Sequence, residues 1–234
     1  MDTIIIGDIH GCLTEFDEIL KLADHKSPNV RIICVGDFID RGPDSLGVVR
    51  RAKELKLEGV RANHEDRLFK WLDNKKSRYQ NCYSQFNEDD INYLKSLPYY
   101  IKLDDLLIVH AGIKPNISLE QQKRDDLINL RYTDENRNFI SLRKIDKLGI
   151  QATNAKFWTE FGPFKTNVIY GHNVYSLSEI KLDKYDDGYS CYGIDTGCCF
   201  GGFLTAINWS TKELIQVKAK EVYYKPGFKT VGEK

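Results

Sequence analysis

The sequence predicts an α/β fold in which a mixed β-sandwich is flanked by helices, giving four layers in the order αββα. Three observations predict it. Short apolar strands alternate with helical stripes over residues 1–65, the second half is richer in strands, and the chain of 234 residues has no internal repeat or Pro-rich linker. A chain of this length fits one large α/β core, so residues 1–234 are expected to form a single domain.

The first part of the chain is expected to build parallel strands. Strand patterns at residues 3–6, 31–35 and 59–62 alternate with apolar residues at helical spacing over 13–23 and 46–55. This β-α-β-α-β order predicts parallel strands that are joined by right-handed crossovers.

The rest of the chain is less regular. Residues 73–90 are polar and are expected to form a loop or a helical insert, whereas 87–97 has the pattern of a helix. Strand patterns at 99–102 and 106–110 predict a hairpin, and 119–148 is expected to be mixed and mostly helical. Later strands are expected at 167–170, 177–180, 190–194, 203–208 and 213–217. Their density predicts antiparallel pairing in the second half.

Composition and charge exclude several classes of protein. The chain has 34 basic and 34 acidic side chains, and this balance argues against nucleic acid or an anionic membrane as its partner. No apolar run approaches the roughly 18–20 residues that span a bilayer, and the first residues lack the pattern of a signal peptide. The six cysteines form no C-x-x-C pair, so reduced thiols and a cytoplasmic location are expected.

Chemistry-bearing residues gather where predicted strands end. The motifs are Gly7-Asp8-Ile9-His10-Gly11, Gly36-Asp37-Phe38-Ile39-Asp40-Arg41-Gly42, Asn63-His64-Glu65, His110-Ala111-Gly112 and Gly171-His172-Asn173. Each follows a short apolar strand, and ligands of open α/β sheets gather at the carboxyl ends of the strands. The five motifs are therefore expected to converge on one rim.

Each motif also has an ordinary structural interpretation. Asp8 could cap a helix, Asp40 and Arg41 could form a surface ion pair that contributes little, and the imidazoles could be buried against backbone carbonyls. The joint pattern favours a shared metal site, because the chain has only 5 histidines and all except His25 end a predicted strand.

The types of ligand indicate the metals and the reaction. Carboxylate, imidazole and amide oxygen suit Mn²⁺, Fe²⁺ or Zn²⁺. Three histidines, two aspartates and one asparagine are too many for one ion that keeps an open position. They suit two ions about 3.5–4 Å apart, as in phosphatases. Arg41 would add bidentate hydrogen bonds to a phosphoryl group.

In this order, the motifs GDIHG, GDFIDRG, NHE, HAG and GH resemble those of the calcineurin-like metallophosphoesterases, in particular the phosphoprotein-phosphatase branch. The resemblance extends from Asp8 to about Asn208 and implies the metallophosphoesterase fold with two divalent ions, Mn²⁺ being favoured over Fe or Zn. The metal ligands that it implies are Asp8 and His10 for the first ion, Asn63, His110 and His172 for the second, and Asp37 as the bridge.

The resemblance also implies roles in catalysis. His64, oriented by Asp40, would protonate the leaving oxygen after in-line attack by a metal-bridging hydroxide. Arg41, Arg131 and Asn63 would contact the phosphate, Arg131 on the weaker evidence of a loose surrounding motif.

The chain departs from the family at Ala62, where the family usually has glycine. A methyl group is tolerable there if φ is negative, so an intact site is expected. The segment from Tyr192 to Ala206 is similar to the closing segment of bacterial ApaH-like symmetrical diadenosine-tetraphosphate hydrolases, although the chain is shorter than they are. Residues 195–202 could equally serve only as a strand, a turn and a return strand.

The favoured substrate is therefore a dinucleoside polyphosphate, and a serine/threonine phosphatase of bacterial or phage type acting on phosphoproteins is the alternative. Residues 73–90 and 114–147 would decide between them. The balanced charge does not support RNA 5′-end processing, and a complete ligand set argues against a non-catalytic scaffold. The tail 223–234 could dock a partner, or simply be a solvated end.

Overall fold

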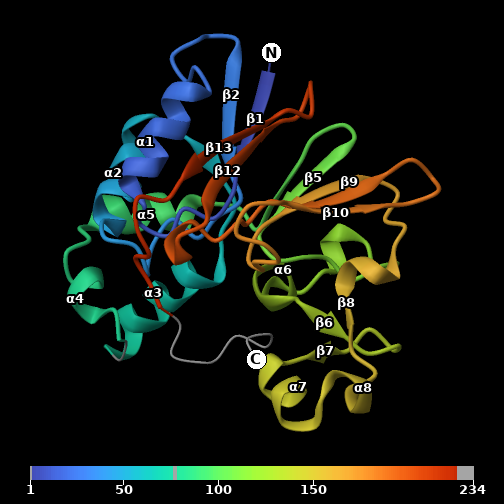
Figure 1. Cartoon of the computed structure of the whole chain (residues 1–234). Coiled ribbons are helices and arrows are strands. Elements are labelled where there is room, and N and C mark those ends of the chain that lie inside the picture. The colour runs from blue at the N-terminus through green and yellow to red at the C-terminus, as the bar shows by residue number, and fades with distance from the viewer. Residues whose placement is uncertain (1, 76–77, 226–234) are drawn as a thin grey trace.

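The computed structural model describes residues 2–75 and 78–225, and Figure 1 shows how their elements are arranged. Two five-stranded sheets form the body, which confirms the predicted α/β class. In the order of neighbouring strands, the first sheet contains β13 (Leu214–Lys218), β12 (Phe203–Asn208), β1 (Asp2–Ile6), β2 (Val30–Cys34) and β3 (Glu58–Gly59). The second contains β10 (Lys181–Lys184), β11 (Ser190–Gly193), β9 (Asn167–Tyr170), β5 (Leu106–Val109) and β4 (Tyr100–Lys102).

Helices lie on the outer sides of the two sheets (Figure 1). Beside the first sheet are α1 (Leu13–Leu22), α2 (Ser45–Glu54), α3 (Asn63–Asn74), α4 (Gln80–Tyr83) and α5 (Glu88–Ser96). The second sheet has α6 (Arg124–Asn129) and the short 3-10 helices η1 (Leu119–Gln121) and η2 (Trp158–Phe161), and η3 (Cys198–Phe200) precedes β12. In the described part of the chain, no helix is long and apolar enough to cross a membrane.

Three hydrophobic clusters separate the four layers. Ile5 of β1 packs with Ile108 of β5 in a cluster between the sheets. The next residue, Ile6, faces the other way and packs with Phe16 of α1, because successive side chains of a strand point to opposite faces. Leu127 of α6 belongs to the third cluster, on the outer face of the second sheet. A near-continuous apolar strand such as β1 is therefore needed where both faces of a sheet are covered.

Strand pairing agrees with the prediction in the first half and corrects it in the second. β1, β2 and β3 are parallel, as expected from the β-α-β-α-β order. In the second half, β4–β5, β10–β11 and β12–β13 are antiparallel. However, β5–β9 and β9–β11 are parallel. The long connections 110–166 and 171–189 make this possible, since parallel neighbours need a crossover of a dozen or more residues.

Two predicted strands are misplaced. The strand expected at 177–180 is wrong, and β10 follows it instead, because the hydroxyl of Ser176 accepts the N–H groups of Ser178 (3.2 Å) and Glu179 (3.1 Å) and holds a turn. The strand expected at 59–62 is only Glu58–Gly59, since the N–H of Arg61 donates to the carbonyl of Pro98 and not to β2.

The segment 119–148 is less helical than expected. It contains α6 and α7 (Leu142–Leu148), but also β6 (Tyr132–Thr133) and β7 (Phe139–Ile140). These strands pair with β8 (Lys156–Phe157) in a third small sheet, and α8 (Ile150–Thr153) follows α7. We call residues 132–157 the accessory lobe; it lies at the end of the second sheet, at the bottom of Figure 1. The last residues of the tail for which docking was considered, 226–234, lie outside the described residues.

Candidate metal centre

The five strand-end motifs converge, as expected. Asp8 and His10 follow β1, Asp37 follows β2, Asn63 and His64 open α3 just after β3, His110 follows β5 and His172 follows β9. The rim thus takes residues from both sheets, and its side chains are buried: none of Asp8, His10, Asp37, His64, His110 and His172 is more than 7% exposed. A buried group of this kind needs internal partners, since polar groups are costly to remove from water unpaired.

Left-handed backbone conformations recur along the rim. Positive φ values occur at His10 (48°), Asp37 (49°), Asp40 (72°), Arg41 (69°) and His172 (67°). Non-glycine residues rarely adopt this conformation, and it persists only where the surrounding structure enforces it. Backbone strain of this kind clusters at functional sites.

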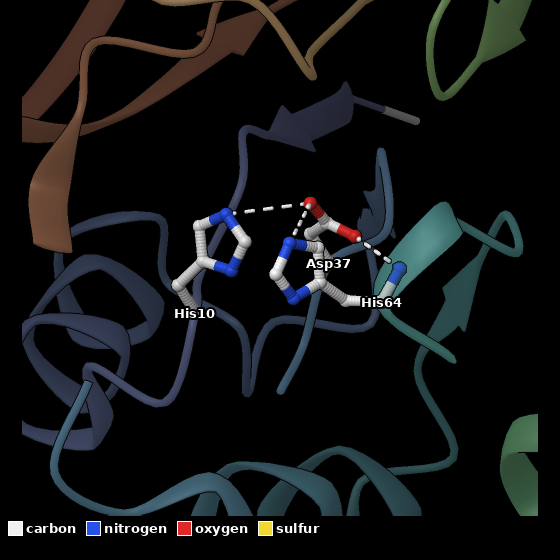
Figure 2. A group of neighbouring side chains, drawn as sticks. All are labelled: His10, Asp37 and His64. Carbon is white, nitrogen blue, oxygen red and sulfur yellow. Dashed lines mark hydrogen bonds and ion pairs between the residues drawn. The ribbon is translucent and has the colours of Figure 1, made fainter. Parts of the chain in front are cut away.

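Asp37 lies at the middle of the centre. Its Oδ2 is 3.3 Å from Nε2 of His10, 3.5 Å from Nε2 of His110 and 3.9 Å from Nε2 of His64. In Figure 2, dashed lines join one oxygen of this carboxylate to a ring nitrogen of His10 and to one of His64. Its other oxygen accepts the backbone N–H of His64 at 3.1 Å. Burial alone would raise the pKa of Asp37, but the positive charge that His64, His110 and His10 carry when protonated, together with that of the Arg41 guanidinium, outweighs it and holds this pKa well below its usual value. Asp37 is therefore a carboxylate.

Backbone carbonyls orient two of the imidazoles. Nδ1–H of His10 donates to the carbonyl oxygen of Ile39 (3.0 Å), and Nδ1–H of His110 donates to that of Val35 (2.9 Å). Burial lowers the pKa of both histidines, which keeps the rings neutral. Each Nε2 then carries a lone pair and lies within 3.5 Å of Oδ2 of Asp37. This is the arrangement of metal-binding histidines, in which the second ring nitrogen is held by a carbonyl or a carboxylate.

The donor set fits divalent cations. Nε2 of His110 and Oδ1 of Asn63 are 3.0 Å apart, although both are acceptors when the ring is neutral. Nε2 of His172 is buried and has no hydrogen-bond partner among the described residues. The pKa of Asp8 is raised well above its usual value by burial and then by the charges of Asp195 and Asp37. Acceptor atoms and carboxylates that are crowded in this way need positive charge close to them. Bound metal ions would supply that charge.

A second chain of contacts starts at His64. Oδ2 of Asp40 lies 2.6 Å from Nδ1 of His64, and it also accepts from Tyr83 Oη–H (2.8 Å) and from Nη1 of Arg67 (3.0 Å). With Nδ1–H directed to Asp40, Nε2 of His64 faces the centre, 3.9 Å from Asp37. This arrangement suits a general acid or base that is oriented by a carboxylate.

Two guanidinium groups lie beside the centre. Nη1 of Arg41 donates to Nε2 of His10 at 2.5 Å. Arg131 donates from Nη2 to the carbonyl of His172 (2.7 Å) and from Nε to Oδ1 of Asn173 (3.1 Å). Burial and then the charge of Arg41 lower the pKa of Arg131. Two neighbouring guanidinium groups of this kind can hold a phosphate through bidentate hydrogen bonds.

The comparisons with known proteins agree with this geometry. Residues 1–202 match the family described as Calcineurin-like phosphoesterase. The chain belongs to the calcineurin-like phosphoesterase family. It is therefore a hydrolase, as the sequence predicted, and the family uses divalent metal ions. The metal-dependent phosphatase chemistry expected from the motifs is confirmed at this level.

Curated relatives align with nearly the whole chain. A protein of Wigglesworthia glossinidia brevipalpis named symmetrical bis(5'-nucleosyl)-tetraphosphatase is 28% identical, over 94% of this chain and 100% of its own. An Oceanobacillus iheyensis protein named bis(5'-nucleosyl)-tetraphosphatase PrpE, asymmetrical, is 27% identical over 94% of this chain and 93% of its own. The first alignment runs over 273 positions, against the 234 residues of this chain, so this chain is the shorter, as expected.

Solved structures share the fold of this phosphoesterase. The crystal structure of a protein assigned as a diadenosine tetraphosphatase superposes with a TM-score of 0.78 at 26% identity, over 93% of each chain. A serine/threonine phosphatase from Saccharomyces cerevisiae superposes with a TM-score of 0.59 over 97% of this chain and 82% of its own. At 15% identity it shows only that the fold is shared. The predicted metallophosphoesterase fold is confirmed.

Sequence reasoning missed several residues of this phosphoesterase site. Asp195 is buried near Asp8, and burial raises its pKa. It follows β11 within two residues, so the strand-end rule that selected the other motifs could have found it. Arg67 and Tyr83 contact Asp40 from α3 and α4, and no local pattern marks them. At Ala62 the φ value is −122°, which meets the condition for an alanine in place of the family's glycine.

Proposed function

We propose that this phosphoesterase hydrolyses dinucleoside polyphosphates and uses two divalent ions, with Mn²⁺ as the favoured metal. The convergence of three imidazoles on the Asp37 carboxylate carries the proposal of a metal site. The substrate class is supported by the relatives named bis(5'-nucleosyl)-tetraphosphatase, which align with 94% of the chain. Residues 1–234 would act as one catalytic domain.

The proposed metal ligands are the six strand-end residues. They are Asp8, His10 and the bridging Asp37 for one ion, and Asn63, His110 and His172 with Asp37 for the other. Two bound ions would supply a nucleophilic hydroxide near neutral pH and would polarise the phosphoryl group. The inward lone pairs of His10 and His110 suit this role, because their Nδ1–H groups are engaged by backbone carbonyls.

The remaining side chains would bind the substrate and move a proton. Arg41 and Arg131 flank the centre and would hold the nonbridging oxygens of the phosphate, as planar guanidinium groups do in bidentate pairs. Asn63 would add a contact to the same phosphate. His64 would carry a proton at Nε2 and give it to the leaving oxygen, while Asp40 holds the opposite nitrogen at 2.6 Å. Acid assistance of this kind contributes about 10²–10⁴-fold to the rate.

Product analysis with Mn²⁺ and diadenosine tetraphosphate tests the proposal. Two molecules of ADP would identify symmetrical cleavage, which the resemblance favours, and ATP with AMP would identify asymmetrical cleavage. Both outcomes support a dinucleoside polyphosphate substrate, and the relatives carry both names. p-Nitrophenyl phosphate serves as the control for an active metal centre. Cleavage of this ester and of a phosphoserine peptide, without cleavage of the dinucleotide, would contradict the proposal and favour a protein phosphatase.

We also propose that the protein works in the cytoplasm. All 6 cysteines are free thiols, and three neighbours in space, Cys12, Cys198 and Cys199, are buried without a disulfide. Thiols that are close together and unpaired suit a reducing compartment. Fractionation of cells that make the protein tests this location.

A further inference from the structure

A pocket of about 690 Å³ adjoins the proposed phosphate site. Lys70 of α3, Lys114 after β5, residues of α6 and residues of the accessory lobe line it. Arg131 also lines it, and this residue donates to the carbonyl of His172 on the rim. The pocket therefore continues outward from the proposed metal centre, and its volume lies in the range of small-molecule sites.

The charge of the pocket suits an anionic ligand. Lys114 is already paired with Asp126, with 2.8 Å between Nζ and Oδ2. Among the described lining residues this leaves Lys70, Lys123 and Arg131 as cations against one carboxylate, that of Asp125. Lys123 is exposed and is not part of the proposed metal centre, so its charge is available to a ligand. Lysine binds phosphate as a point charge and needs no fixed geometry.

Part of the pocket lining is apolar and aromatic. Phe139 of β7 is 44% exposed and Leu142 at the start of α7 is 43% exposed, and both line the pocket. An exposed aromatic ring at the edge of a cationic pocket offers a surface on which a base can stack. Within the accessory lobe, which supplies these residues, Phe157 is buried in the core, whereas α7 has no buried residue and leaves its apolar side chains available.

We infer that this pocket binds the nucleoside and the outer phosphate of a nucleotide whose reacting phosphate lies at the metal centre. The base stacks on Phe139, and Lys123 with Lys70 neutralises the phosphate next to the one that Arg131 contacts. This inference rests on the proposed function and deepens it, because it assigns the nucleotide specificity to the accessory lobe. The phosphorylated side chain of a phosphoprotein would bind at the metal centre, and the aromatic surface of the pocket would then have no ligand to contact.

Equilibrium binding to the Mn²⁺-loaded protein tests the inference without catalysis. The two probes are ADP and inorganic pyrophosphate, which share the diphosphate and differ by the adenosine and one ionisable oxygen, with Mn²⁺ in excess over either. Calorimetry is expected to show that ADP binds at least about tenfold more tightly than pyrophosphate, the gain of one base–aromatic stack. Phe139→Ala should remove most of this difference, whereas Phe139→Tyr, which keeps a ring, should retain it.

The lysine and the control variants sharpen the test. Lys123→Ala should weaken both probes about equally, because it acts on phosphate. Leu148→Ala and Lys147→Ala are matched controls in α7, outside the pocket lining, and should leave the ratio of the two dissociation constants unchanged. Equal binding of ADP and pyrophosphate by the wild type, or an unchanged ratio in Phe139→Ala, would overturn the inference. If the protein prefers ADP through Phe139 but does not cleave diadenosine tetraphosphate, the proposed function is wrong, whereas the assignment of this pocket as a nucleotide site is retained.

Discussion

The rim and the accessory lobe are built in opposite ways. The rim takes buried side chains from the ends of strands in both sheets, and Asp37, His64 and His110 are at most 1% exposed. The lobe, residues 132–157, consists of two-residue strands and short helices that leave Phe139 and Leu148 about half exposed, at 44% and 50%. A rim whose side chains are held by several elements can position atoms for a reaction. A lobe with few buried contacts can vary in sequence and conformation, and it can therefore select the substrate.

The largest effect is expected from Asp37→Asn in the rim. Asp37 faces three imidazoles, so loss of its charge should remove metal and reduce turnover of p-nitrophenyl phosphate by more than about 10⁴-fold, the upper end for a general acid. Metal content per chain and activity are measured together. Asp17→Asn, at an exposed carboxylate of α1, is the control and should retain both. A fully metal-loaded, active Asp37→Asn enzyme would show that the rim does not work as proposed.

His64→Asn separates proton transfer from metal binding within the rim. We expect the metal content to stay while turnover falls by about 10²–10⁴-fold, because the proton donor is lost. The loss should be larger for an alkyl phosphate than for p-nitrophenyl phosphate, whose leaving group needs less protonation. Turnover rates on both esters, together with the metal content of the variant, test this expectation. Full activity on the alkyl phosphate would rule out the acid role of His64.

A pair of glycine substitutions compares the two regions directly. A Cβ at Gly171 would lie 1.9 Å from Oδ1 of Asp8, so Gly171→Ala must displace a proposed metal ligand and should reduce activity about 10²-fold. Gly149 in the lobe has φ +82° and ψ 151°, a conformation that side chains other than glycine rarely adopt, although a methyl group added there would meet no atom within 4 Å, so Gly149→Ala costs about 1–3 kcal/mol of backbone strain. Activity assays and thermal unfolding should show a catalytic defect for the first variant and, for the second, a loss of stability without a catalytic defect. Equal activity of the two variants would contradict the expected difference in rigidity between the rim and the accessory lobe.

The smallest effect is expected away from both regions, at Asp90 of α5. Burial would raise the pKa of this carboxyl, but the Lys53 ammonium at 2.6 Å and the backbone N–H of Asn87 outweigh it and lower the pKa. A lowered folded-state pKa contributes stability above the unfolded value, near pH 4, and this contribution is lost as the pH falls through the folded pKa.

Asp90→Asn should therefore reduce the free energy of unfolding by about 1–2 kcal/mol at neutral pH. Urea unfolding at several pH values checks this: the difference from the wild type should vanish well below pH 4, and turnover should stay at the wild-type level. A difference that persists unchanged at low pH would show that the charge of Asp90 is not its cause.

Sequence patterns located most of the rim because the signals are local. A short apolar run followed by Asp-x-His or Asn-His indicates both a strand and side chains of a type that binds metal. The carboxyl ends of neighbouring parallel strands also lie at the same edge of the sheet. The same reasoning failed at 177–180, where a serine hydroxyl holds a turn in an apolar stretch, and at 119–148, where two-residue strands leave no periodicity to detect. Local patterns are weakest where an element is short and is held by distant partners.

By itself the sequence determined the fold class, the strand-end position of the rim residues and the phosphoesterase chemistry, because periodicity and residue type are properties of adjacent positions. The tertiary structure alone decided which atoms meet. It brought Tyr83 and Arg67 to Asp40, directed Nε2 of His110 toward Asp37, and placed Phe139 beside the same pocket as Arg131. These contacts join residues far apart in the chain, and they depend on left-handed turns and packing that no single stretch of sequence encodes.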